Sequence, residues 1–258
     1  MPINYLRGLT SPARTDSANR RLGRSLAFVA GGINAGGFLA VGQYTSHMSG
    51  IVSALADNLA LGDLLLVFAG FASLLAFLTG AMTSSLLINW GRSHRLHSEY
   101  AMPLLLEAGL LLGFGILGSN LENHRLLFVP TTVVLLCYVM GLQNAMITKI
   151  SKAEIRTTHV TGIVTDIGIE LGRLCYWRMA QSKPADHPGG ADTPPALNRK
   201  KFTLLTSLLL MFFIGGLIGA LGFKHIGFTA TIPLAATLFL LAIVPLIDDL
   251  TRHPHLPQ

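Results

Sequence analysis

Two histidines lie in matching polar stretches of an otherwise apolar chain. His47 belongs to the stretch SHMSGIVS and His159 to THVTGIVT, so both follow the pattern Ser/Thr-His-x-Ser/Thr-Gly-Ile-Val-Ser/Thr. A histidine can gain or lose a proton near physiological pH, which suits a group that binds a solute or exchanges protons. The alternative is that each histidine only braces its polar turn through hydrogen bonds, and their occurrence in both stretches leaves the two interpretations open.

Further polar side chains fall in or beside apolar runs, where each costs about 2.5 to 3.5 kcal/mol at membrane depth. Asn34 and Asn144 lie in glycine-containing stretches, where an interrupted helix would free backbone carbonyls. They are predicted either to coordinate a solute or to bridge two helices, at a gain of about 0.6 kcal/mol. The predicted substrate-binding residues are Asn34, His47, Gln143, Asn144, Thr158, His159 and Thr161.

Three carboxylates, Asp166, Glu170 and Glu107, are predicted to serve proton or ion coupling, with Asp166 as the main carrier. On a helix, His159, Gly162, Asp166 and Glu170 share one face, because they are spaced by three, four and four residues. That face would line a water-filled cavity, with the helix N-terminus turned towards an anionic group. If the segment lies on the membrane surface instead, the same face is the wet side of an amphipathic helix. Glu107 falls inside an apolar run and is expected to face the bundle or the headgroups.

The sequence has no pattern typical of a catalytic or metal site. It contains no nucleophile elbow, Walker loop, dinucleotide fingerprint or HExxH zinc motif. Two histidines without a carboxylate set do not supply the three or four ligands that a metal needs. Cys137 and Cys175 have no partner at ligand spacing and are expected to be free thiols. We therefore assign no catalytic residue, no metal and no cofactor.

Composition predicts an all-α, polytopic membrane helix bundle. With 51% hydrophobic and 12% charged residues and a mean hydropathy of +0.54, the chain has too little polar surface for a soluble domain. Long continuous apolar runs indicate helices rather than barrel strands. Two shorter stretches, 50–62 and 160–172, are predicted to be half-helices or interfacial helices. Spans are predicted near 25–45, 64–89, 101–119, 126–148, 203–223 and 228–247.

Basic residues mark one side of the membrane. With the six predicted spans, 17 of the 19 Lys and Arg residues fall in segments on the same side of the membrane. The two on the opposite side are Arg125 and Lys224. The positive-inside bias then predicts cytoplasmic N- and C-termini. The net charge of +6 is interpreted as a topology signal and as contacts to anionic headgroups of the lipid bilayer, not as a nucleic-acid surface.

The chain divides at polar segments. Residues 1–24 form a basic cytoplasmic N-terminal segment, 25–119 a first membrane half, 126–247 a second half and 248–258 a tail. The second half includes a cytoplasmic linker over 178–201, whose stretch from Lys183 to Asn198 is rich in Pro, Gly and Asp.

Residues 31–62 and 141–172 resemble each other and suggest an internal repeat. Asn34 aligns with Asn144, His47 with His159, and Gly50 with Gly162. Three spans separate the two copies, so the second half would be inverted relative to the first, as in many secondary transporters. The alternative is that small and hydroxyl residues recur because membrane helices pack through them.

The segments GGINAGGFLAVGQYTSHMSG and GLQNAMITKISKAEIRTTHVTGIVTDIGIELG look like the two signature regions of the YoaK family of bacterial membrane proteins (domain of unknown function 1275). The similarity covers about residues 24–247. In the first motif the family usually has Asp at Asn34, Thr at Ser49 and Asn at Ile51. The resemblance implies the fold and a bacterial inner-membrane location, but it supplies no activity.

The leading functional expectation is a secondary transporter or permease for a small polar or anionic solute, with its site between inverted halves. A channel is the nearest variant. The rival from another class is a membrane interaction or regulatory protein whose polar motifs are structural and whose linker is a docking surface. An intramembrane enzyme comes third, and a homo-oligomer is left open.

Overall fold

The computed structural model describes residues 15–96, 98–118, 125–181 and 197–251. The first half of the chain forms α2 (Asp16–Val41), α3 (Met48–Leu61), α4 (Leu64–Ser93) and α5 (Ala101–Gly118). The second half forms α6 (Arg125–Ile150), α7 (Val160–Gln181), α8 (Arg199–Ile226), the 3-10 turn η1 (Gly227–Ala230) and α9 (Thr231–Thr251). The described residues are helical or lie in short connections, so the predicted all-α class is confirmed.

Local capping residues decide where the helices begin and end. The Thr15 side chain accepts a hydrogen bond from Ala18 N at 3.3 Å, so α2 begins at Asp16 rather than near residue 25 as predicted. Gly62 has φ 77°, a conformation that favours glycine, and it ends α3 in a tight turn. Asp63 then caps α4 by accepting from Leu66 N at 3.2 Å.

Helix α7 is longer than predicted. It continues beyond residue 172 to Gln181, so part of the segment expected to be linker is helical. The end of the predicted linker, residues 199–201, also belongs to a helix, because α8 begins at Arg199, and residues 182–196 lie outside the described residues.

Four helical stretches in the described part of the chain are long and apolar enough to cross a membrane: Leu64–Ser93, Ala101–Gly118, Val129–Ile150 and Arg199–Ile243. The last contains α8, η1 and the first part of α9. Each predicted span thus coincides with a helix. Helix α2, however, is not among the helices that are apolar enough to count as candidate spans. Helix α2 is the least apolar of the predicted spans and its interior residues are buried by other helices, so it faces protein rather than lipid.

Large apolar side chains cover the outside of the bundle. On α4, Leu65 is 78% exposed and Phe68 is 70% exposed, while Ser73, Ser84 and Gly91 of the same helix are buried. A soluble protein rarely exposes so long an apolar surface, whereas lipid solvates it. The arrangement is that of a polytopic membrane helix bundle.

Glycines bring the central helices into backbone contact. A Cβ added at Gly31 of α2 would clash with the carbonyl oxygen of Phe212 on α8, and one at Gly215 would clash with that of Phe28. Helices α4 and α6 meet in the same way, because a Cβ at Gly80 would strike the carbonyl of Tyr138 and one at Gly141 that of Phe77. Small residues at both crossings permit the close approach that membrane helices use.

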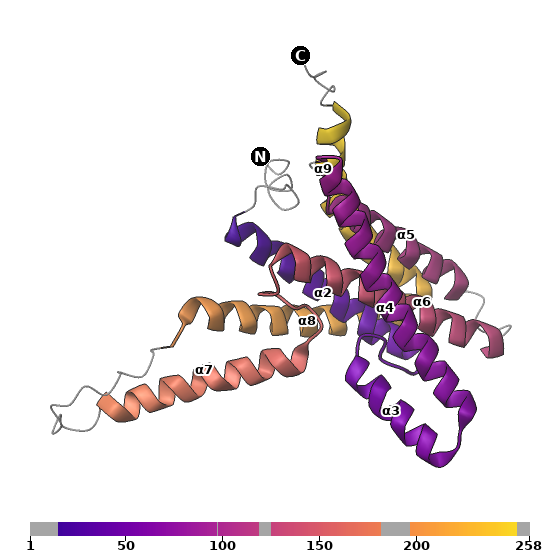
Figure 1. The fold of residues 1–258 in the computed structure, drawn as a ribbon, viewed down its shortest axis with the longest axis horizontal. Helices are drawn as coiled ribbons and strands as arrows, with labels where there is room; N and C mark the ends of the chain where they lie inside the picture. Colours follow the sequence, from indigo (N-terminus) through magenta and orange to yellow (C-terminus); the bar gives the residue numbers. More distant parts are fainter. Residues whose placement is uncertain (1–14, 97, 119–124, 182–196, 252–258) are drawn as a thin grey trace.

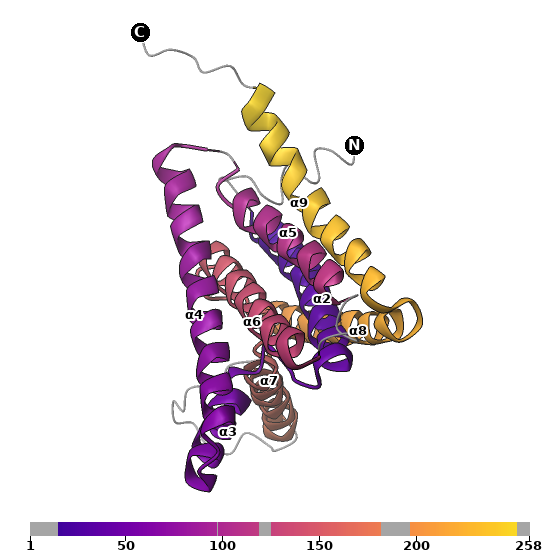
Figure 2. The ribbon, with the colours of Figure 1, turned by 90° about the vertical axis from the view of Figure 1, so that its right-hand side faces the viewer.

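The packing partners are exchanged between the two halves. Helix α2 packs along α8, α6 packs along α4, and α5 packs against α9. Arg24 contacts Ser207 while Gly36 lies against Phe223, so α2 and α8 run in the same direction. Figure 2 shows α5 and α9 side by side, away from α3 and α7.

The two shorter helices complete a pair of hairpins. Helix α3 folds back on α4, and α7 folds back on α8. Figure 1 shows the α7–α8 hairpin at the left and the α3–α4 hairpin at the lower right of the molecule. The chain that leads into α3 and the chain that leads into α7 therefore meet near the middle, where α2 and α6 cross.

Candidate functional site

A cavity of about 740 Å³ lies where the two short helices begin, and we call it the central cavity. Residues from both halves line it in matching pairs. Each pair occupies corresponding places in the two copies of the polar pattern or in the helices that pack behind them. The pairs are Asn34 with Asn144, Ser46 with Thr158, His47 with His159, Ser49 with Thr161, and Phe77 with Phe212.

The two asparagines anchor the loops that carry the histidines. Asn34 Oδ1 accepts hydrogen bonds from Ser46 Oγ at 2.8 Å and from Ser46 N at 3.3 Å. Asn144 Oδ1 accepts from Thr158 Oγ1 at 2.7 Å, while its Nδ2 donates to Met140 O at 2.8 Å. Each long helix thus fixes the residue directly before a histidine, which sets the place of that histidine at the cavity wall.

The histidines stand at the N-terminal ends of α3 and α7. His47 is the N-cap position of α3, and His159 directly precedes α7. A Cβ added at Gly50 would clash with the His47 ring, and one at Gly162 would clash with the His159 ring. The glycine in each copy of the pattern therefore lets the imidazole lie flat against the first turn of the helix that follows it.

Arg156 is the residue that sets the charge of the central cavity. It is the one Lys or Arg among the lining residues of the described chain, and those lining residues include no Asp or Glu. Tyr44 occupies the corresponding place in the first half, three residues before His47. Two helix N-termini also face the cavity, and each leaves backbone N–H groups without an acceptor inside the helix. An anionic group fits this wall.

The structure brings six of the predicted substrate-binding residues to the central cavity: Asn34, His47, Asn144, Thr158, His159 and Thr161. Gln143 is buried away from it. Its Nε2 donates to Leu26 O at 3.4 Å, which ties α6 to α2, and its Oε1 has no hydrogen-bond partner in the described chain.

The predicted coupling carboxylates do not line the central cavity. Asp166 lies on α7 with its side chain 41% exposed and 3.3 Å from Lys201 Nζ. Glu170 is buried, bonds Arg173 Nη1 at 2.9 Å and accepts from Asn198 N at 3.0 Å, so it holds α7 to the start of α8. Glu107 is buried on α5, and neither of its oxygens has a hydrogen-bond partner in the described chain.

Sequence reasoning missed Arg156, Tyr44 and the phenylalanine pair. Arg156 was interpreted as a topology signal and as part of the second signature segment, but not as a binding residue, although it stands three residues before His159 as Tyr44 stands before His47. Extending the alignment of the repeat backwards from the histidines would have singled it out. Phe77 and Phe212 lie in apolar runs, and no sequence signal distinguishes them from lipid-facing residues.

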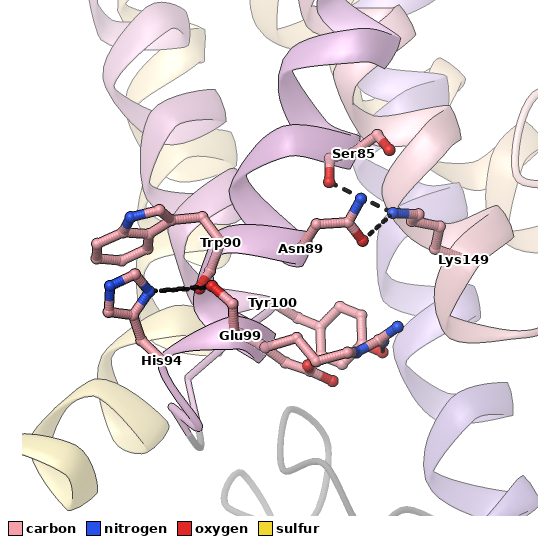
Figure 3. Close-up of polar contacts among 9 residues, drawn as sticks. Ser85, Asn89, Trp90, His94, Glu99, Tyr100 and Lys149 are labelled. Atoms are coloured by element: carbon pink, nitrogen blue, oxygen red, sulfur yellow. Dashed lines mark hydrogen bonds and ion pairs between the residues drawn. The ribbon is translucent and has the colours of Figure 1, made fainter.

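A second polar cluster joins α4, the turn that precedes α5, and α6, as Figure 3 shows. Arg92 Nε donates to Glu99 Oε2 at 3.1 Å, and its Nη2 donates to Tyr100 OH at 3.1 Å. Nearby, Lys149 Nζ donates to Asn89 Oδ1 at 2.8 Å and to Ser85 O at 3.3 Å. Each charge in this cluster has a protein partner, so the cluster ties helix ends together rather than forming an open site. Across the described residues, no group of three or more His, Cys, Asp or Glu side chains is arranged to hold a metal ion.

A family model described as "Protein of unknown function (DUF1275)" matches residues 22–244. The family resemblance inferred from the two signature segments is therefore confirmed. No curated protein and no solved structure matched the chain.

Proposed function

Since the chain belongs to the DUF1275 family of proteins of unknown function, we propose from its own geometry that it is a transporter or permease for a small anionic solute. The solute binds in the central cavity. The observation that carries the proposal is that both halves contribute the same kinds of polar group to one cavity inside an apolar bundle. Polar side chains at membrane depth are expensive, and a set of them gathered around a cavity is typical of a solute site.

The proposal includes an inverted repeat. Its support is the exchange of packing partners: α2 meets α8 at Gly31 and Gly215, and α6 meets α4 at Gly141 and Gly80. Helices α2 and α6 cross in opposite directions, because Gln143 bonds Leu26 whereas Leu136 lies against Gly37. Two halves related by a two-fold axis in the membrane plane would give both relationships.

The charge of the cavity wall supports an anion as the solute. Arg156 supplies a permanent positive charge, and the N-terminal ends of α3 and α7 each add the equivalent of about half a positive charge. His47 and His159 add ring nitrogens that can donate hydrogen bonds. No lining carboxylate of the described chain opposes them.

For coupling we favour Asp166 among the three predicted carboxylates. It is partly exposed and lines a cavity together with His159, so it is accessible to an ion or solute there. Both oxygens of Glu170 are engaged by Arg173 and Asn198, which suits a structural role. Glu107 lines none of the cavities to which His47 or His159 contributes.

The proposed setting is the bacterial inner membrane, with both termini in the cytoplasm and anionic headgroups beside the basic segments. Its support is a small cavity of about 270 Å³ at the starts of α2 and α8, lined by Arg20, Arg24, Arg199 and Lys200. No acidic residue of the described chain lines it. Basic groups at helix ends next to apolar spans are typical of contact with lipid phosphates.

A non-transporting membrane interaction or regulatory protein is the second candidate, and one observation favours it. The side-chain oxygens of Asn34 and Asn144 are already bonded to Ser46 and Thr158, so these residues can serve the fold alone. In that case the central cavity would bind no small anion.

A thermal-shift screen on detergent-purified protein separates the two candidates. A series of small anions, inorganic and carboxylate, should include one that raises the melting temperature with saturation, because a ligand stabilises the state that binds it. The same anion should then exchange across the membrane of reconstituted vesicles. Loss of the shift in Arg156→Gln, with the unliganded melting temperature retained, assigns binding to the central cavity. A screen in which no anion shifts the wild type, or in which Arg156→Gln responds equally, contradicts the proposal.

A further inference from the structure

The central cavity has a smaller cavity on each side. The α3-side cavity, of about 490 Å³, lies among α2, α3, α4 and α6 and shares Tyr44 and His47 with the central cavity. The α7-side cavity, of about 430 Å³, lies against α7 and α8 and shares Arg156, His159 and Thr161 with the central cavity. The two outer cavities share no lining residue with each other.

The outer cavities occupy corresponding places in the two halves. His47 and Gly50 line the first, and His159 and Gly162 line the second. Ala54 on α3 and Asp166 on α7, each seven residues after its histidine, also face these cavities. Tyr44 lines the α3-side cavity and Arg156 the α7-side cavity, and each stands three residues before a histidine.

We propose that the three cavities form one route for the solute, in which Tyr44 with His47 is the gate on the α3 side and Arg156 with His159 is the gate on the α7 side. The route rests on the proposed function, because a row of cavities has this use only in a protein that moves a solute. Each gate consists of the side chains that separate the central cavity from one outer cavity. Opening one gate while the other stays closed would expose the solute to one side of the membrane at a time.

A small movement suffices to open or close each gate. Each imidazole lies against a glycine of the helix that follows it, so no side chain at that position restricts its rotation. Asn34 and Asn144 hold the residue before each histidine and not the ring itself. A rotation of the histidine side chain, or a tilt of the short helix that it begins, therefore changes the width of the passage without breaking the anchor.

The two gates differ in chemistry, and the difference makes Arg156 the residue that selects for charge. The α3-side cavity is lined mainly by aliphatic side chains, among them Val41, Leu55 and Val133. The α7-side cavity contains Glu154, Arg156 and Asp166. Of these charged groups only Arg156 also reaches the central cavity. An anion that passes from the α7 side is met by this guanidinium, whereas a cation is repelled there.

Cysteine accessibility tests the route without requiring transport. The background is Cys137→Ala with Cys175→Ser, which removes one buried and one exposed thiol. Single probes are then introduced by Ala54→Cys in the α3-side cavity, Ser49→Cys in the central cavity and Thr165→Cys in the α7-side cavity. Leu112→Cys on α5, which lines none of these cavities, is the control.

Membrane-impermeant thiosulfonate reagents, one anionic and one cationic, are applied to either face of sealed vesicles. We expect the Ala54→Cys variant to react from one face and the Thr165→Cys variant from the opposite face, while Leu112→Cys stays unreactive. The Ser49→Cys variant should react about tenfold faster with the anionic than with the cationic reagent from the α7 side. Adding Arg156→Gln should remove that preference, and adding Arg156→Lys should retain it.

The route is overturned if the two outer probes react from the same face, if the central probe is unreactive from both faces, or if Arg156→Gln leaves the charge preference unchanged. Thr148→Cys, which also lines the central cavity, replaces Ser49→Cys if that variant does not fold. Expected labelling together with no anion-dependent stabilisation would reject the proposed function, while showing that the three cavities connect. The reverse result would reject the route alone.

Discussion

Thr158, the residue before His159, donates a hydrogen bond of 2.7 Å to the side-chain oxygen of Asn144 in the C-terminal part of α6. The bond is partly buried, and the same contact recurs between Ser46 and Asn34 at 2.8 Å. The position of each histidine at the cavity wall therefore depends on one asparagine of the long helix that precedes it in the chain.

Replacing Thr158 should lower the free energy of unfolding by the contribution of this hydrogen bond. We expect Thr158→Val to lower the free energy of unfolding by about 1 to 2 kcal/mol, because the Asn144 oxygen loses its donor inside the protein. The matched control is Thr165→Val, since the Thr165 hydroxyl is exposed and bonds only Thr161 O of its own helix. Chemical unfolding in mixed micelles measures both. Equal costs for the two variants would show that the Asn144 contact is not specific.

The glycine contacts predict that an added methyl group destabilises the α4–α6 and the α2–α8 crossing to a similar extent. Gly80→Ala and Gly215→Ala should each cost about 1 to 3 kcal/mol, because the added Cβ meets a backbone carbonyl that cannot move aside easily. Gly109→Ala on α5 should be neutral or stabilising by up to about 1 kcal/mol, since nothing lies within 4 Å of its added Cβ. Thermal unfolding compares the three. If Gly80→Ala behaves like Gly109→Ala, the close crossing of α4 with α6 is wrong.

Gly162 is expected to control the position of the His159 ring. In Gly162→Ala the new Cβ displaces the ring from the start of α7, and we expect anion affinity to fall by about tenfold, equivalent to 1.4 kcal/mol. Gly168→Ala on the same helix has open space around its Cβ and serves as the control. Anion-dependent thermal shifts give both affinities. An unchanged affinity in Gly162→Ala would separate the His159 ring from solute binding.

Asp166 is predicted to matter for coupling and little for stability. Its ion pair with Lys201 is partly exposed on both sides, so Asp166→Asn should change the free energy of unfolding by less than about 1 kcal/mol. If Asp166 takes part in coupling, Asp166→Asn should slow anion uptake into reconstituted vesicles while leaving the anion-dependent thermal shift unchanged. Asp57→Asn, an exposed residue of α3, is the control. Wild-type uptake by Asp166→Asn would remove the residue from the coupling scheme.

The basic cavity at the starts of α2 and α8 predicts a lipid requirement. An anionic phospholipid added to neutral detergent micelles should raise the melting temperature of the wild type more than that of an Arg199→Gln, Lys200→Gln double variant. Lys152→Gln, which lies in the loop before α7, should respond as the wild type does. Free inorganic phosphate that reproduces the lipid effect would point to a soluble anion instead.

The sequence predicted the helices better than their ends, for a physical reason. Continuous apolar runs and the polar His-containing stretches marked each of the helices α2 to α9, because burial in lipid or protein requires those patterns. The start of α2 at Asp16 and the extension of α7 to Gln181 were missed. Both extra segments carry arginines and leave the apolar pattern, so their helicity comes from capping by Thr15 and from continuation of an existing helix.

The candidate site was predictable only where it repeated itself. Asn34, Asn144 and the histidines were found because they occur twice at matching spacing. The phenylalanines Phe77 and Phe212 join the cavity through contacts between residues far apart in the chain, which spacing does not reveal. Asp166 was expected on a cavity-lining face with His159, and both line the α7-side cavity, but Asp166 does not reach the central cavity and pairs with Lys201 instead.

The exchange of partners between the halves also constrains how the chain folds during synthesis. Helix α2 emerges long before α8, the helix that covers its glycine face, and Arg24 meets Ser207 across 183 residues. Until α8 has entered the membrane, the face of α2 that contains Gly31 and Asn34 lacks its packing partner. That face is then in contact with lipid or with an insertion factor. The first half released alone should therefore be short-lived in the cell, and its survival should be restored when the second half is produced beside it as a separate polypeptide.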